Sequence, residues 1–297
     1  MTRRTVIAAA IVAAWLAGIA TLARRELFRG ETERMVQAGL LIAPGAEYFT
    51  VTRDSDRVGY ASSTIDTSAT RIHVSEFLLT EETEGKAVRR MAVRGIVNLT
   101  RGMRLTDFRF DLGESYGPWS AVGTYSADSV LTVVTTAGHA KPDTTRRQLH
   151  GQLMLPTTVP LAMVLERRPV VGRHRAFTLY DPMRDSVYDV AVHIRAESLF
   201  VITDSATLDP STTRWTVANQ DTVRAWRIET VGGGIVSGWV DEKGRIVRTA
   251  PFGEFTLHRT AYEIAFQNWS LDNKEHPRAV VPPPSAADTL AAGAAHD

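Results

Sequence analysis

The most apolar run of the chain lies near its amino end. Residues 5–23 read TVIAAAIVAAWLAGIATLA, nineteen residues without a charged side chain. As a helix this run spans roughly the ~30 Å hydrocarbon core of a bilayer, because each residue adds about 1.5 Å. Arg3, Arg4, Arg24 and Arg25 bracket it at the two headgroup levels. The pattern predicts a transmembrane anchor. A cleaved signal peptide is the alternative, although its apolar region usually has only about 7–15 residues.

The anchor also indicates where the rest of the chain lies. The leading tail, residues 1–4, is short, and long domains translocate largely regardless of their charge. We therefore expect a single-pass protein of the bacterial inner membrane, with residues 1–4 in the cytoplasm and the body facing the periplasm or the cell exterior. The bilayer is its first expected partner.

Behind the anchor the pattern changes from helical to strand-like. Residues 24–45 have helix-compatible composition and predict a stalk, which Pro44 and Gly45 end. In residues 106–112, Phe108 and Phe110 alternate with Asp107 and Arg109, as in a sheet with one wet face. Similar runs, all rich in Val, Ile, Thr and aromatic residues, are residues 48–52, 59–65, 71–79, 87–99, 120–125 and 130–135. Short spacings favour antiparallel hairpins.

The second half of the body repeats this pattern after an interruption. Residues 154–172 contain two prolines and a short apolar helix candidate at 161–165, which predicts a hinge between a first β-rich half, 46–153, and a second, 173–272. We expect a hairpin loop at 241–244, a final helix at 260–269 and a disordered tail at 273–297. Further strands are expected at 176–180, 187–194, 199–202, 213–217, 223–229, 235–240 and 245–249.

The predicted fold is therefore mainly β: antiparallel twisted sheets or a half-barrel in two β-rich halves, preceded by an N-terminal transmembrane helix. With 297 residues and 44% apolar content the chain can fill a core. Its 34 basic and 33 acidic residues nearly balance, which argues against nucleic acid as a partner. The absence of cysteine excludes disulfides, thiolate metal sites and cysteine nucleophiles.

One short motif has the form of a catalytic site. Gly113-Glu114-Ser115-Tyr116-Gly117 matches the G-x-S-x-G pattern that raises a serine nucleophile. That motif needs a helix directly after the serine, whereas a predicted strand follows here. A glycine-bounded hairpin loop is the simpler interpretation. The strand carboxylates Asp181 and Asp241 are weaker hydrolase candidates.

Other candidate chemistry is sparse. The eight histidines form no H-x-x-x-H or H-x-H pair, so we predict no metal and no cofactor. We assign no catalytic residue, and the ligand-binding residues stay unknown. The numerous strand aromatics fit either core packing or the lining of an apolar pocket: Trp119, Trp215, Trp226, Trp239, Phe108, Phe110 and Tyr188.

Two motifs carry a family resemblance. Arg57-Val58-Gly59-Tyr60 and the later run WVDEKGRIV at 239–247, with many antiparallel strands between them, resemble periplasmic β-rich domains with the half-barrel form of the lipoprotein-carrier proteins. They also resemble the non-catalytic region that precedes the catalytic domain of some bacterial transglutaminase-like proteins. The half-barrel resemblance implies an apolar cavity. Transglutaminase chemistry cannot be carried over, because this chain has no cysteine.

Three functions follow from these observations. The first is a non-enzymatic, membrane-anchored extracytoplasmic domain that binds a hydrophobic, lipid-like ligand or an envelope protein. The second is an interaction or scaffold protein of the envelope with a filled core. The third is a serine hydrolase that uses Ser115.

Overall fold

The computed structural model describes residues 39–165, 168–232, 236–249 and 255–283. In this part of the chain sixteen strands form one sheet, which confirms the mainly β prediction. The predicted anchor at 5–23 lies outside the described residues. Among the described helices none is both long enough and apolar enough to cross a bilayer.

The sheet runs through both β-rich stretches of the sequence. Its order is β8-β7-β6-β5-β4-β3-β2-β1-β15-β14-β13-β12-β11-β10-β9, with β16 beside β4. The first strands are β1 (Gly45–Arg53), β2 (Asp56–Thr67), β3 (Arg71–Glu84), β4 (Ala87–Thr100), β5 (Leu105–Glu114), β6 (Trp119–Tyr125), β7 (Val130–Ala137), β8 (Asp143–Gln148) and β9 (Leu153–Met154). The later strands are β10 (His174–Asp181), β11 (Ser186–Asp209), β12 (Arg214–Thr230), β13 (Ser237–Asp241), β14 (Ile246–Thr249), β15 (Thr256–Thr260) and β16 (Ala279–Val280).

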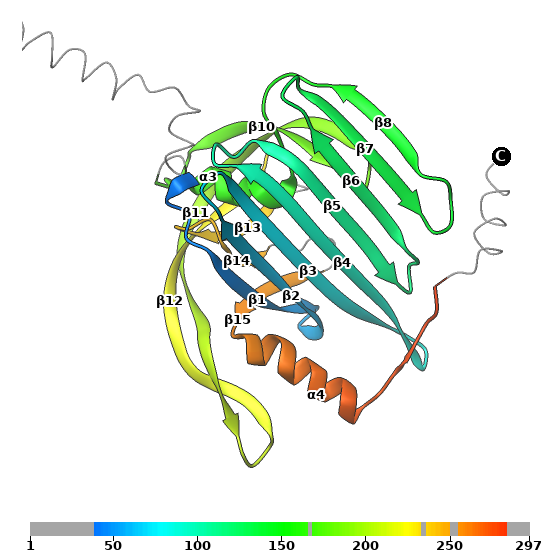
Figure 1. Cartoon of the computed structure of the whole chain (residues 1–297). Helices are drawn as coiled ribbons and strands as arrows, with labels where there is room; N and C mark the ends of the chain where they lie inside the picture. The colour runs from blue at the N-terminus through cyan, green and yellow to red at the C-terminus, as the bar shows by residue number, and fades with distance from the viewer. Residues whose placement is uncertain (1–38, 166–167, 233–235, 250–254, 284–297) are drawn as a thin grey trace, which may run out of the picture.

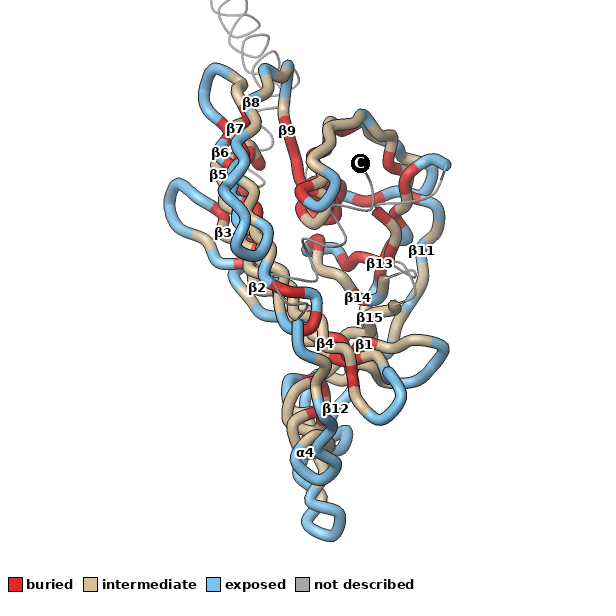
Figure 2. Tube along the Cα trace, turned by 90° about the vertical axis from the view of Figure 1, so that its right-hand side faces the viewer, coloured by how far each residue is buried: buried red, intermediate tan, exposed pale blue. Residues whose placement is uncertain are grey.

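Antiparallel pairing of β1 with β15 joins the two stretches. Neighbouring strands within each stretch are mostly consecutive in sequence, as short hairpin loops dictate. The sheet bends into two layers, which Figure 1 shows face-on and Figure 2 from the side. Most buried segments lie where these layers face one another (Figure 2).

The interior between the layers is filled by side chains and a short helix. After the 3-10 turn η1 (Pro156–Thr158), helix α3 (Val159–Leu165) is buried almost throughout. The predicted helix at 161–165 is therefore confirmed, but it packs into the core with Phe108 and Trp226. Most of the aromatics singled out in the sequence are core or pack against it, including Phe110, Trp119 and Tyr188.

The loop at 241–244 is the predicted hairpin turn, and its glycine is required. Gly244 has φ +77°, and a Cβ there would lie 2.8 Å from the Cα of Leu161. The Asp241 carboxylate accepts hydrogen bonds from the backbone N–H groups of Lys243 and Arg245, both at 2.9 Å. The turn therefore fixes α3 against the second layer.

Several sequence predictions differ from the structure. The separate strands expected at 187–194 and 199–202 are one strand, β11, because a register shift between Ile194 and Ala196 lets the pairing with β12 continue through the residues between them. The strands expected at 213–217 and 223–229 are likewise one strand, β12. The final helix begins after 260, because β15 continues to Thr260 and pairs with Tyr48. It comprises the π-helix η2 (Glu263–Gln267) and α4 (Asn268–Glu275). The predicted disorder from 273 is wrong for 273–283, which contain the end of α4 and strand β16.

Candidate functional site

The two faces of strands β1–β3 carry different side chains. Side chains alternate between the faces of a strand, and the register places Tyr48 beside Ser62, and Ser62 beside Phe77. Glu47, Ser63 and Glu76 form the adjacent row. The first row lies on the outer face of the sheet, under η2, and the second points toward α3.

The outer row forms a groove with an aromatic lining. Its volume is about 250 Å³, and its lining residues are Tyr48, Tyr60, Ala61, Ser62, Phe77, Arg94, Tyr262, Ala265 and Phe266. Ring centroids lie 5.0 Å apart for Tyr48 and Tyr262 and 5.0 Å apart for Tyr60 and Phe266, both edge-to-face. These spacings are those of favourable aromatic pairs. The groove is a partly open, apolar surface of a size that suits one ring or a short chain.

One wall of the groove is the helical segment η2, and Arg57 holds it in place. A π-helix is rare and usually only one turn long. The Arg57 guanidinium donates to the carbonyls of Ile264 at 2.9 Å and Ala265 at 2.6 Å. It also lies over the Trp269 ring, 5.5 Å from the centroid. Arg57 on β2 therefore ties the wall to the floor of the groove.

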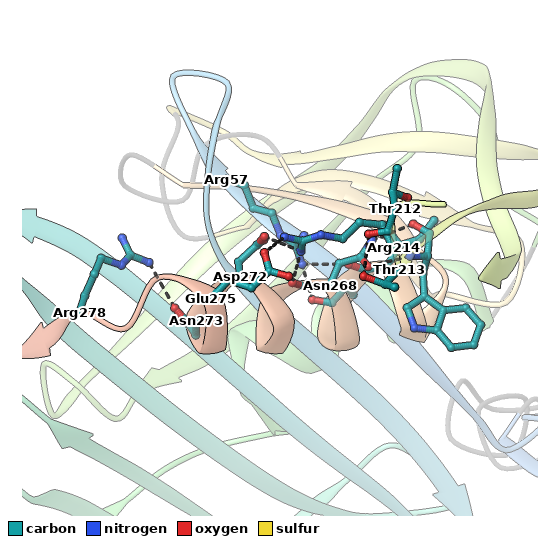
Figure 3. A network of polar contacts seen from close by, with 12 residues as sticks. Arg57, Thr212, Thr213, Arg214, Asn268, Asp272, Asn273, Glu275 and Arg278 are labelled. Carbon is teal, nitrogen blue, oxygen red and sulfur yellow. Dashed lines mark hydrogen bonds and ion pairs between the residues drawn. The ribbon is translucent and has the colours of Figure 1, made fainter. Parts of the chain in front are cut away.

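The tip of the β11–β12 hairpin holds the next turn of helix, α4 (Figure 3). Arg214 donates to Asp272 and to Glu275, each at 2.6 Å. The amide of Asn268 accepts from the backbone N–H of Trp215 at 2.9 Å and donates to its carbonyl at 2.8 Å. These contacts join residues more than fifty positions apart, so the position of the groove wall depends on tertiary contacts.

Beyond α4 the chain returns to the sheet, and this is where Ser115 lies. β16 pairs in parallel with the start of β4, and Arg278 donates to the buried carboxylate of Glu81 at 2.6 Å. The Ser115 hydroxyl is buried, accepts from the Arg90 N–H at 3.0 Å and donates to the Val281 carbonyl. Strand β6 follows the motif, as the loop interpretation predicts. The Ser115 hydroxyl thus links β4 to the segment that follows β16.

The inner row borders a small cavity. Its volume is about 30 Å³, room for one or two water molecules and too little for an acyl chain. Beside it lies a buried ion-pair network: Glu47 pairs with Arg245 at 2.6 Å and with Arg259, which also pairs with Asp241 at 3.0 Å. The apolar interior cavity implied by the half-barrel resemblance is, at this position, a packed core.

Glu76 stands apart from that network. It lines the cavity and, within the described residues, makes no hydrogen bond or ion pair. Burial raises the pKa of its carboxyl to about 7. The nearby Thr157 hydroxyl is buried and also lacks a hydrogen-bond partner among the described residues.

The remaining candidate residues have structural partners. Asp241 belongs to the ion-pair network, and Asp181 accepts from the Met183 N–H at 2.9 Å. His174 and His193 stack across β10 and β11 with centroids 5.4 Å apart, a pairing that sequence spacing alone does not reveal. In the ranges that the structure covers, no group of three or more His, Cys, Asp or Glu could hold a metal ion.

Sequence reasoning missed the groove residues. Tyr48, Tyr60 and Phe77 sit on the outward positions of strands that were predicted in large part, so their alternation was a usable signal. Their partners Tyr262 and Phe266 come from a segment some two hundred residues later, and no local pattern connects them.

Comparisons with known proteins add little to this geometry. No protein-family model matches the chain, and no curated protein matches it. Among solved structures, the chain is similar to the crystal structure of a β-barrel-like protein of a domain of unknown function, DUF1849, from Brucella abortus. That similarity has 12% sequence identity and a TM-score of 0.39, and it covers 73% of this chain and 95% of the other. These findings do not confirm the two resemblances drawn from sequence motifs, and the function must be argued from the chain itself.

Proposed function

We propose that this chain is a non-enzymatic, membrane-anchored extracytoplasmic domain that binds a small hydrophobic ligand in its outer aromatic groove. The observation that carries this proposal is the cluster of five aromatic rings that leaves about 250 Å³ of open, apolar space on the sheet. Exposed aromatic concavities of this kind are typical of binding sites.

The contrast with the interior supports this location. The inner cavity of about 30 Å³ cannot hold a lipid tail, and the core around α3 is packed. The groove wall is held by Arg57 and Arg214, so the rings stand in fixed positions before any ligand arrives. Preorganised sites lose less conformational entropy on binding.

The test of binding is native mass spectrometry of the full-length chain with added octanol as a minimal apolar probe. We expect a bound octanol on the wild type and a loss of at least about tenfold in occupancy for Phe77→Ala, since one aromatic face of the groove is removed. Phe200→Ala, which removes a ring packed on Trp239 away from the groove, is the matched control and should bind normally. Equal binding by both variants would reject the groove as the site.

The membrane location has its own test. Residues 5–23 predict that the full-length chain sediments with membranes and resists extraction by alkaline carbonate. A chain recovered intact in the high-speed supernatant would contradict the anchor without affecting the groove.

A protein partner is the second candidate, and the β11–β12 hairpin favours it. Leu199 and Val201 are 65% and 64% exposed there. Away from the neighbouring strands β10 and β13, β11 and β12 pair only with each other among the described residues. Exposed apolar residues beside unpaired strand edges favour association with another chain. Cross-linking at Leu199 that captures one defined envelope protein would support this function.

A further inference from the structure

Arg94 is the charged residue in the lining of the aromatic groove. It lies on β4 opposite Phe77 and is exposed. Within the described residues its guanidinium makes no hydrogen bond or ion pair. Arg57 and Arg90, on the same face, are engaged by carbonyl and carboxylate oxygens, whereas the donors of Arg94 are open to a ligand.

The carboxylate nearest to Arg94 in the strand register is already occupied. Asp111 stands opposite Arg94 on β5. Both of its oxygens accept hydrogen bonds from Arg109, at 2.7 and 2.8 Å. Asp111 is therefore engaged by Arg109, and within the described residues it makes no ion pair with Arg94.

The other charged residues near the groove are engaged by protein groups. Arg57 is engaged with carbonyl oxygens, which do not neutralise its charge. Glu81, on the same face, is enclosed between Arg90 and Arg278, so two guanidinium groups surround one carboxylate. No Asp or Glu is among the described residues that line the groove.

We propose that the ligand of the groove is an anionic amphiphile, whose oxyanion pairs with Arg94 while a short apolar body lies against the rings of Tyr60, Phe77 and Phe266. This inference rests on the proposed function and names the ligand class. A planar guanidinium forms paired hydrogen bonds to carboxylate or phosphate oxygens, and both head groups share that chemistry. The volume of about 250 Å³ fits one ring or a short chain rather than a two-chain lipid.

Four probes with straight alkyl tails of nearly equal length and different heads test the charge requirement. Octanoate, octyl phosphate, octanol and octyltrimethylammonium are titrated against the full-length chain, and occupancy is measured by native mass spectrometry. We expect the two anions to bind about tenfold more tightly than octanol, as a charge-assisted hydrogen bond predicts, and the cation to bind more weakly than octanol. A difference between octanoate and octyl phosphate identifies which oxyanion is preferred.

Two arginine variants complete the test. Arg94→Gln should lose the tenfold preference for the anions over octanol. Arg71→Gln is the matched control, since Arg71 is an exposed residue on β3 outside the groove lining. It should keep the preference. Thermal melting checks that both variants fold.

The outcomes separate this inference from the proposed function. If octanol and octanoate bind equally, or if Arg94→Gln keeps the preference, the anionic ligand is wrong while groove binding stands. If none of the four probes binds the wild type, the proposed function fails and the inference fails with it.

Discussion

Alternate residues of strands β1–β4 form the inner and the outer face of the sheet, and the two faces differ in their chemistry. On the inner face, Glu47, Arg245, Arg259 and Asp241 compensate one another beside a packed core. On the outer face, rings surround an open groove and Arg94 makes no ion pair among the described residues. The charges of the inner face are therefore compensated by one another, whereas the outer face carries the groove that we propose as a binding site.

The largest expected effect is on the inner ion-pair network. Arg259→Ala leaves the carboxylates of Glu47 and Asp241 buried with less compensation, and we expect a loss of about 3–5 kcal/mol in the free energy of unfolding. Arg109→Ala breaks an exposed pair with Asp111 and should cost about 0–1 kcal/mol. Urea denaturation measures both. Equal losses would mean that the two faces do not differ in this way.

Glu76 should make stability depend on pH. Its pKa is about 7 in the folded chain and 4.5 as its ordinary value, so between these pH values the folded chain holds a proton that the unfolded chain releases. The unfolding free energy therefore falls as pH rises from 4.5 to 7, by up to about 3 kcal/mol, and levels off above 7.

Glu76→Gln removes this titration. We expect the variant to be more stable than the wild type at pH 8 and nearly equal to it at pH 4, because neutral glutamic acid and glutamine are alike in charge. Denaturation series at the two pH values measure the difference. A difference that stays constant between pH 4 and pH 8 would show that Glu76 does not titrate in this range.

The turn that fixes α3 should respond to a single methyl group. Gly244→Ala combines positive φ with a Cβ 2.8 Å from the Leu161 backbone, and we expect a cost of about 2–3 kcal/mol. Gly85→Ala is the control: its φ is +62° but nothing lies within 4 Å, so only the backbone cost of about 1 kcal/mol remains. The melting temperatures of both variants measure the two costs. A larger loss for Gly244→Ala than for Gly85→Ala is the contribution of the steric contact.

The smallest effect on stability is expected in the groove. Tyr262→Ala removes a ring that is 37% exposed, and we expect a loss of about 1 kcal/mol or less, well under the 3–5 kcal/mol expected for a core ring such as Phe108. Octanol binding, by contrast, should fall severalfold. If Tyr262→Ala lowered the free energy of unfolding as much as Phe108→Ala, the groove rings would be part of the hydrophobic core and not an open binding surface.

The sequence predicts the strands better than their assembly. Alternation in residues 106–112 correctly places Phe108 inside and Arg109 outside, because one strand carries that information locally. The pairing of β1 with β15 depends on the whole chain, so the joining of both stretches into one sheet has no local signal.

The groove shows the same limit at the level of a site. Tyr60 and Phe77 are visible as outward strand residues, but their covering ring, Phe266, comes from a π-helical turn held by Arg57. The opposite error is possible at Ser115. Its sequence motif matches a catalytic pattern, but its hydroxyl forms hydrogen bonds with the backbone of Arg90 and Val281. The spacing of residues in a motif does not show whether a side chain is buried or which distant residues it contacts.

Carbene footprinting distinguishes ligand binding at the outer face, which we propose, from binding in the interior. The full-length chain is photolabelled with a diazirine-bearing octyl probe, and the adducts are mapped by peptide mass spectrometry. We expect the specific adducts, those competed by excess octanoate, on the peptides that carry Tyr60, Phe77 and Phe266. Competed adducts on the α3 peptide, with the groove peptides unlabelled, would show that the ligand binds in the interior and not in the groove.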